Sequence, residues 1–530
     1  MGLGLALLAG AISAQSPSPE PEAPSPSSEP EPEPAAEAPT SDGPPVAYQL
    51  KATLDVLEHR VKGEGTITWR NASTEEQREV WLHLYLNAFK NERTVFMRST
   101  ATRGFRGGGK PETWGWLRVD ALKGQGTDLW AKAEAHSPDD PDDETDIRVP
   151  LAEPVPPGGE VTFEVRWTAQ LPTVTARTGY LGSFHMVAQW FPKLAKLEPD
   201  GTRAHFAFHR LSEFYADYGS YDVTIDVPQG FVVGASGPRV EEQDAGERHV
   251  VRHRMDRVHD FAFCAWDQFE VHERQAPTGV AMRALVPRGD GDLAALELDE
   301  AAFGLAFLGE RFGAYPYEVL TIVHPPPKAR EAGGMEYPTL ITTGGRWYQP
   351  RLGMRNLESV TIHELAHQWF YGLLGSNEHA WPFLDEGLTT WATLWALESR
   401  YPDRSGFSGG WLGWTIGHPA LVRAGSAKAA GKDAIARSAR DFALGSDYGG
   451  LVYARTATLL ESLRRLYPEK MPVAMKAYAD AHRFGHPVPD DLLSAVREHV
   501  GERAATAMRR VLFERGTLDV SVASMWSEKA

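Results

Sequence analysis

The sequence predicts a multidomain protein in which an N-terminal antiparallel β domain precedes a catalytic domain that is α+β and mostly helical. Apolar and polar residues alternate over residues 46–268, which is typical of half-buried strands. Helical periodicity, with apolar residues every three to four positions, begins near residue 295. The chain has 530 residues, of which 42 % are apolar, enough for two or three domains with large cores.

Residues 1–14 form an apolar run that ends in small residues, a pattern typical of a secretory signal peptide. The positively charged segment that usually precedes such a run is missing, so an untargeted N-terminus is the alternative. The run is too short to cross a bilayer, which takes roughly 20 residues, and it predicts no transmembrane segment. We therefore expect export of the protein to the periplasm or the exterior of the cell.

Residues 15–45 are rich in proline, glutamate and serine and hold eleven of the 38 prolines. A segment with so few apolar residues predicts a disordered spacer. The chain carries a net charge of −17 and no basic stripe, which argues against a nucleic-acid-binding protein. Cys264 is the single cysteine, so an intrachain disulfide and an all-cysteine metal site are excluded.

The segment 46–268 is predicted to hold the β domain. Residues 48–73 alternate and contain Gly63 and Gly65, which we interpret as the turn of a strand pair. Residues 160–171 and 221–236 repeat the alternating pattern.

The segment 269–530 is predicted to be the catalytic domain. A helix from residue 292 onward leads into two short apolar runs that predict strands. Longer helical stretches follow, and the last part of the chain predicts further helices. The expected strands are 318–324 and 338–344, and the expected helices include 356–374, 385–400 and 450–466.

The stretch "TIHELAHQWF" carries two histidines four residues apart. At about 100° per residue, His363, Glu364 and His367 share one face of a helix. Residues on the other face are apolar and predict packing into a core: Ile362, Leu365, Ala366, Trp369, Phe370 and Leu373.

This polar face is suited to a catalytic zinc ion. Zinc at such sites takes three protein ligands and leaves a position for water. Two histidines one turn apart can reach one ion, and the glutamate between them can accept a proton from the water. The alternative is a helix that carries two histidines with no metal role.

A third ligand is offered by the stretch 381–395. Asp385 is expected to cap a helix, and Glu386 lies in its first turn, where a carboxylate is favoured by the helix dipole. Periodicity alone does not choose between them as a ligand. Glu386 is alternatively an ordinary acidic residue of a first helical turn.

These residues resemble the aminopeptidase N family of gluzincin zinc metallopeptidases, in a short, bacterial-type form. That family places a glutamate nineteen residues after the second histidine, inside an Asn-Glu-Gly triplet, and Glu386 has this spacing. The resemblance implies a thermolysin-like catalytic domain and one Zn²⁺ held by His363, His367 and Glu386, with Glu364 as the catalytic base. Asp385 replaces the asparagine of the triplet.

A second family signature, Gly-x-Met-Glu-Asn, corresponds to the substrate-binding residues Gly333, Gly334, Met335 and Glu336. Glycines let a peptide backbone approach closely. The resemblance implies that Glu336 anchors the substrate's free α-amino group. Tyr337 replaces the asparagine, and a plain glycine turn is the alternative.

A third signature rests on the resemblance alone. The family places a tyrosine at the start of a helix roughly 65–70 residues after the third ligand, and Tyr453 lies 67 residues after Glu386. It would stabilise the oxyanion of a tetrahedral intermediate. Tyr448 matches another tyrosine near the cleft in some relatives.

The resemblance covers most of residues 46–530 and implies a zinc-dependent aminopeptidase that hydrolyses the N-terminal peptide bond with metal-activated water. Peptides are then the expected partners, and the sequence gives no sign of an oligomeric state. An endopeptidase with the same zinc site is the first alternative, because the sequence lacks the helical domain that covers the cleft in larger members. A catalytically idle binding protein is the second.

Overall fold

The computed structural model describes residues 43–516 except 100–110, 138–139, 141–142, 346–348, 350–351, 403 and 410–413. The chain divides into a unit of residues 1–37 and a unit of residues 38–530, and all elements described here belong to the second. The predicted signal peptide and nearly all of the predicted spacer lie outside the described residues. Within the described part of the chain, none of the helices has the length and apolar character needed to cross a membrane.

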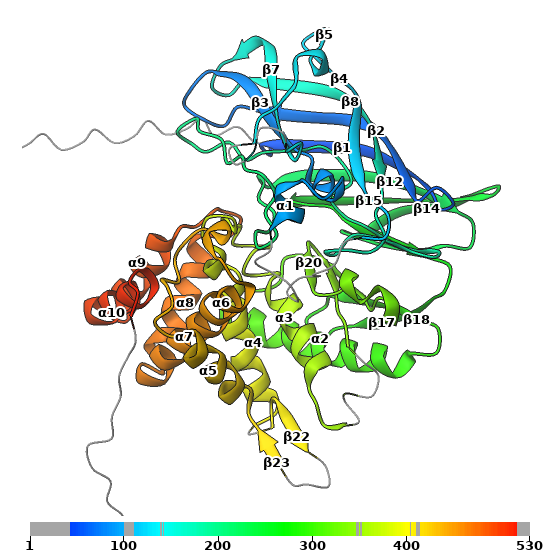
Figure 1. Cartoon of the computed structure of the whole chain (residues 1–530). Coiled ribbons are helices and arrows are strands. Elements are labelled where there is room, and N and C mark those ends of the chain that lie inside the picture. The colour runs from blue at the N-terminus through cyan, green and yellow to red at the C-terminus, as the bar shows by residue number, and fades with distance from the viewer. Residues whose placement is uncertain are drawn as a thin grey trace, which may run out of the picture. The chain divides into compact units, whose positions relative to one another are not determined.

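The region after residue 43 is built on an eight-stranded sheet (Figure 1). Its neighbours pair antiparallel except for one parallel pair, β1 with β12. In spatial order the strands are β14 (Arg239–Ala245), β15 (Arg248–Val258), β12 (Gly219–Pro228), β1 (Val46–Asp55), β2 (Arg60–Arg70), β8 (Glu160–Gln170), β4 (Trp116–Gly124) and β5 (Thr127–Asp128).

The predicted turn at Gly63 and Gly65 is wrong, because both glycines lie inside β2. The chain reverses at residues 56–59, where the Asp55 carboxylate accepts hydrogen bonds from two backbone N–H groups. A Cβ atom on Gly63 would lie 2.1 Å from the Trp167 ring. Gly63 therefore permits close packing across the sheet rather than a turn.

Two four-stranded sheets and short helices complete the β region, and its buried side chains form one large core. The first sheet has the order β13 (Val232–Ala235), β16 (Phe263–Trp266), β10 (Phe184–Val187), β9 (Gly179–Leu181). The second has the order β11 (Lys193–Leu194), β3 (Gln77–His83), β7 (Asp146–Val155), β6 (Glu134–Ala135). The short helices are η1 (Tyr85–Phe89), α1 (Val95–Arg98) and η2 (Trp130–Lys132).

A five-stranded sheet opens the second region, next to the predicted boundary at residue 269. Its order is β17 (Phe269–Gln275), β18 (Ala281–Pro287), β19 (Val319–Val323), β21 (Leu340–Thr342) and β20 (Met335–Tyr337), so β20 lies at an edge. A two-stranded hairpin, β22 (Phe407–Gly409) with β23 (Trp414–Ile416), lies further along the chain.

Helices make up most of this region and share a second core (Figure 1). They are α2 (Gly291–Phe312), η3 (Pro327–Ala332), α3 (Asn356–Ala366), η5 (Pro382–Leu384), α4 (Glu386–Arg400), α5 (His418–Ala429), η6 (Ala439–Asp441), α6 (Gly445–Tyr448), the π-helical η7 (Gly449–Arg455), α7 (Thr456–Leu466), α8 (Lys470–Ala481), α9 (Pro489–His499) and α10 (Glu502–Phe513). The predicted fold class, a β domain followed by a mostly helical α+β domain, is confirmed.

The helix predicted over residues 356–374 is shorter than expected, because α3 ends at Ala366. The next residues form tight turns in which the N–H of Gly372 donates to the carbonyl of His367 at 2.8 Å. Tyr371 has φ of 113°, a value that an α-helix does not accommodate. The chain therefore leaves the helix directly at His367.

Candidate active site

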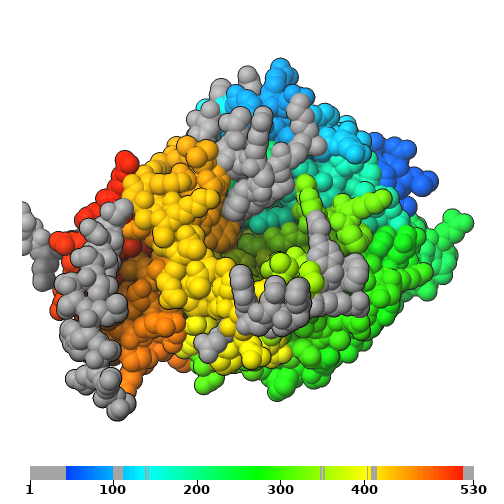
Figure 2. Space-filling view, turned by 60° about the horizontal axis from the view of Figure 1, so that its bottom comes forward, coloured from blue at the N-terminus to red at the C-terminus, as the bar shows by residue number. Residues whose placement is uncertain are grey.

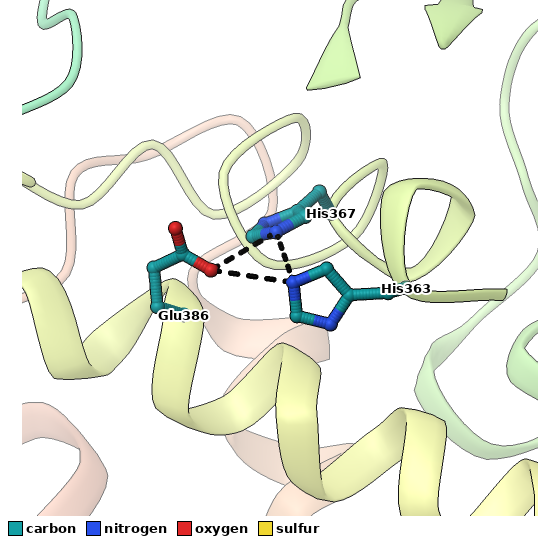
Figure 3. A group of neighbouring side chains, drawn as sticks. All are labelled: His363, His367 and Glu386. Atoms are coloured by element: carbon teal, nitrogen blue, oxygen red, sulfur yellow. Dashed lines mark hydrogen bonds and ion pairs between the residues drawn. The ribbon is translucent and has the colours of Figure 1, made fainter. Parts of the chain in front are cut away.

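Three side chains from two helical segments point toward one another (Figure 3). His363 lies in the last turn of α3, His367 directly follows that helix, and Glu386 begins α4. The two Nε2 atoms are 3.2 Å apart. The Glu386 Oε2 atom is 3.3 Å from the His363 Nε2 atom and 3.4 Å from the His367 Nε2 atom. The structure thus brings together the three residues that the resemblance implies as ligands.

This spacing fits a zinc ion. Bonds of roughly 2.0–2.1 Å in a tetrahedral arrangement place neighbouring ligand atoms about 3.3–3.4 Å apart. Two imidazole nitrogens that face each other at 3.2 Å also require a cation or a proton between them. Two nitrogens and one carboxylate oxygen are a donor set that zinc accepts at catalytic sites.

Polar groups behind His367 fix its ring. The Asp385 Oδ1 atom is 2.5 Å from the His367 Nδ1 atom, and the Thr389 hydroxyl is 3.2 Å from the same nitrogen. Asp385 is the N-cap residue of α4, as predicted, but its side chain makes no cap bond to that helix. Asp385 instead selects the tautomer in which the Nδ1 atom of His367 is protonated and the Nε2 atom can bind a metal.

Glu364 and Glu336 lie close to this trio. One ligand atom from each of Glu336, Glu364 and His367 lies within 4.8 Å of the others. Burial raises the pKa of the Glu364 carboxyl, and His363 and His367 oppose that shift. A carboxylate with a raised pKa beside a metal trio is suited to accept and return a proton.

The Glu336 carboxyl is almost completely buried. Its Oε1 atom has no hydrogen-bond partner among the described residues. Burial raises the pKa of this carboxyl well above its usual range, and His367 lowers it in part. A buried acceptor without a partner is costly to leave unpaired, so this oxygen is suited to a cationic ligand.

The two glycines before Glu336 lie in tight surroundings, and Gly334 is the one close to the base. Gly334 has φ of 74°, and a Cβ atom on it would lie 3.8 Å from the Glu364 Oε1 atom. A Cβ atom on Gly333 would lie 2.1 Å from the carbonyl oxygen of Thr343. The Met335 side chain is fully buried and belongs to the core of the β region. Glycine is therefore required at both of the first two positions.

Tyr453 also reaches the centre. Its hydroxyl donates to the Glu386 Oε1 atom, and its ring stacks on His363 with centroids 6.2 Å apart. Tyr453 lies in the π-helical segment η7, and such segments are frequent at functional sites. Tyr448, buried at the end of α6, packs edge-on against the Tyr453 ring.

Sequence reasoning missed several polar residues around the centre. Glu378 is buried, and one of its oxygens lies within 4.8 Å of those of Glu336 and Asp385. Gln368 donates from Nε2 to the carbonyl oxygens of Glu336 and Tyr337. Arg177 contacts the glycine segment from the β region. Only Gln368, directly after a predicted ligand, carried a local signal.

The space-filling view shows a hollow between the yellow and orange residues of the later helices and the green residues from the middle of the chain (Figure 2). The His363 side chain, with 20 % of its surface exposed, is the most accessible of the three implied ligands. Glu386 and His367 retain 3 % and 1 %.

Comparisons with known proteins point to one family. Residues 296–511 match the family described as Peptidase family M1 domain. The chain is 26 % identical over 207 residues to Aminopeptidase M1 of Arabidopsis thaliana, covering 37 % of this chain and 22 % of that protein. It is 27 % identical over 245 residues to Aminopeptidase 2 of Candida albicans, covering 43 % of this chain and 25 % of that protein. The matches thus span about a quarter of these relatives.

A solved structure shares the fold over most of the chain. The M1 zinc metallopeptidase of Deinococcus radiodurans superposes with a TM-score of 0.60 at 16 % identity, covering 89 % of this chain and 94 % of that one. A mutant of the same protein, bound to a Tyr-Ser-Ala substrate, superposes with the same TM-score. At this identity the likeness concerns the fold.

Proposed function

We propose that this chain, whose residues 296–511 match the Peptidase family M1 domain, is a zinc-dependent aminopeptidase that hydrolyses the N-terminal peptide bond of peptides. The observation that carries the proposal is the buried Glu336 carboxyl beside Glu364 and His367. A metal trio and a base suffice for a peptidase, and a buried carboxylate next to them adds a site for a free amine.

His363, His367 and Glu386 would hold the zinc ion. When bound, zinc supplies a Lewis acid that polarises the scissile carbonyl and acidifies water. The chain's own residues do the rest. Glu364 accepts the proton of the attacking water and later delivers it to the leaving amine nitrogen.

Tyr453 and Glu336 act on the two ends of the reacting group. The Tyr453 hydroxyl, held beside Glu386, donates a hydrogen bond to the developing oxyanion. The Glu336 carboxylate accepts hydrogen bonds from the α-ammonium group of the substrate. This anchoring places the first peptide bond at Glu364 and the metal trio.

We also propose that the protein is exported from the cytoplasm. An apolar run over residues 1–14 followed by a proline-rich stretch supports export to the periplasm or the exterior. Mass spectrometry of the intact protein from cell fractions tests this. A mature N-terminus near residue 14 in the exported fraction is the expected result, and an uncleaved chain in the cytoplasm would contradict it.

The decisive experiment for the activity compares fluorogenic aminoacyl amides with their N-acetylated counterparts. We expect cleavage of the free-amine amides, loss of activity with a chelator and recovery with zinc. Equal cleavage of blocked and free amides would contradict the aminopeptidase and favour an endopeptidase. Inactivity of zinc-loaded protein on the whole panel would favour a binding protein.

A further inference from the structure

Arg177 lies in a tight turn of the β region. This turn contacts the second region, from residue 269 onward, which is called the catalytic region below. Ala176 and Arg177 have φ of 41° and 72°, two successive left-handed residues that are not glycine. Such residues are strained and persist where surrounding contacts hold them. The turn is therefore held in place by its neighbours.

Arg177 contacts the glycine segment, which is residues 333–336, the residues just before that segment, and Glu213. The Arg177 N–H donates to the carbonyl of Glu331 at 2.8 Å. The Arg177 Nε atom donates to the carbonyl of Gly334 at 2.8 Å. The Arg177 Nη1 atom donates to the Glu213 Oε1 atom at 2.6 Å, so one guanidinium joins two separate acceptors.

The contacts are protected from solvent. The Arg177 side chain is 16 % exposed and that of Glu213 is 2 % exposed. Charge-assisted hydrogen bonds in such surroundings are stronger than those at a surface. The planar guanidinium presents donors at fixed angles, and a lysine ammonium in its place could not reproduce this geometry.

Gly334 is thus held from two directions. Its carbonyl accepts from Arg177, and its N–H donates to the carbonyl of Thr342 at 2.8 Å. Gln368 binds the carbonyls of Glu336 and Tyr337 from the turn after α3. Since Gly334 lies against Glu364, a shift of this segment changes the distance between Glu336 and the base.

We propose that Arg177 is a positioning residue through which the β region sets the place of the Glu336 carboxylate. It acts by holding the Gly334 carbonyl while Glu213 fixes its guanidinium. The inference rests on the proposed function, because it assigns Arg177 a role in recognition of the substrate's free amine. Arg177 and Glu336 should therefore depend on each other.

A double-mutant cycle tests this dependence in the full-length, zinc-loaded protein. Arg177→Lys keeps the charge and loses the fixed donor to Gly334. We expect it to lower kcat/KM for alanyl amide by roughly tenfold, the loss of one charge-assisted hydrogen bond. In a Glu336→Gln background the same change should cost less than about threefold, because coupled sites are not additive.

Equal losses from Arg177→Lys in both backgrounds, or none in either, would overturn the inference. Arg203→Lys is the matched control. Arg203 is a partly buried arginine of the same region that binds the Gln77 Oε1 atom and the carbonyl of Glu79, and its replacement should leave kcat/KM unchanged. Zinc content and melting temperature are measured for each variant.

Glu213→Gln provides a second approach if Arg177→Lys does not fold. It keeps the size of the side chain and weakens the hold on the guanidinium, so a smaller loss that also vanishes in the Glu336→Gln background is expected. Equal losses from Glu213→Gln in both backgrounds would overturn the inference. Failure of the proposed function shows differently, as cleavage of acetylated amides by the wild-type protein.

Discussion

One ion pair of the β region and the carboxyl cluster around the predicted metal trio bury charge in opposite ways. In the β region, the Lys193 Nζ atom lies 2.7 Å from the Asp260 Oδ2 atom, and each side chain is 1 % exposed. Gln189 donates to the same carboxylate at 2.6 Å. One buried cation thus meets one buried anion, and the pair leaves nothing for a ligand to neutralise.

The catalytic region instead gathers carboxyl groups in excess. Five buried acidic side chains surround the two histidines of the predicted metal trio: Glu336, Glu364, Glu378, Asp385 and Glu386. Buried charges need a counterion, and the cations among the described residues do not balance these carboxylates. A buried ion pair whose charges cancel, such as Lys193 with Asp260, has a structural role. An excess of buried carboxyl groups indicates where a metal ion and a substrate amine bind.

Acid should weaken the β region through its buried histidines. Burial lowers the pKa of His83 to about 3 and that of His185, His253 and His259 to about 4, from 6.5. These rings are neutral in the folded state. Their contribution to the free energy of unfolding is therefore fully present above pH 6.5 and is lost as the pH falls toward 4. Each costs up to roughly 1.4 kcal/mol per pH unit in that window. Denaturant unfolding between pH 7 and pH 5 measures the slope.

His253→Phe should reduce that slope. A stability that stays constant between pH 7 and pH 5 in the wild-type protein would show that these histidines do not carry the effect.

Breaking the balanced pair is expected to have the next largest effect. Lys193→Met leaves the Asp260 carboxylate buried without a cation, which should destabilise the protein by about 3–5 kcal/mol. The double change Lys193→Met with Asp260→Asn removes both charges and should recover most of the loss. Denaturant unfolding measures the free energy of unfolding of the two variants. An equal loss of stability in both would show that the unpaired Asp260 charge is not the cause.

Replacing the base should lower activity and leave the metal in place. Glu364→Gln removes the proton acceptor but none of the three predicted ligands. Turnover should fall by a factor on the order of 10² or more, with zinc content unchanged in elemental analysis. A zinc-loaded variant with wild-type turnover would exclude Glu364 as the base.

The group behind His367 should affect metal retention more than chemistry. Asp385→Asn keeps the shape and weakens the hydrogen bond to the His367 Nδ1 atom. Zinc affinity should fall by about 10–100-fold. Competition with a fluorescent chelator measures this. Asp441→Asn, a half-exposed control on η6, should leave the affinity as it was.

The polar face of the metal helix could be predicted because it is local. Periodicity put His363, Glu364 and His367 on one side and the apolar residues on the other, and all six of the latter are buried. The end of that helix could not be predicted in the same way. Backbone bonds to the His367 carbonyl and the left-handed Tyr371 set it, and neither leaves a residue pattern.

Other roles could not be predicted from the sequence, because they depend on contacts between residues that are far apart along the chain. Gly63 looked like a turn residue because its reason, the Trp167 ring, lies on another strand. The roles of Arg177 and Glu213 could not be predicted from a motif. Arg177 binds the carbonyl of Gly334 and Glu213 binds Arg177, and these contacts exist only in the folded chain. Asp385 was considered at sequence level, but burial and the His367 ring decided its role.

The proposed aminopeptidase activity depends on binding of the substrate's free amine by the Glu336 carboxylate. The most direct measurement is kcat/KM for alanyl amide in a zinc-loaded Glu336→Gln variant. A loss of roughly 10–10²-fold is expected from removing a buried charge-assisted contact. Wild-type kcat/KM of this variant on the free-amine substrate, with zinc fully bound, would show that Glu336 does not bind the amine.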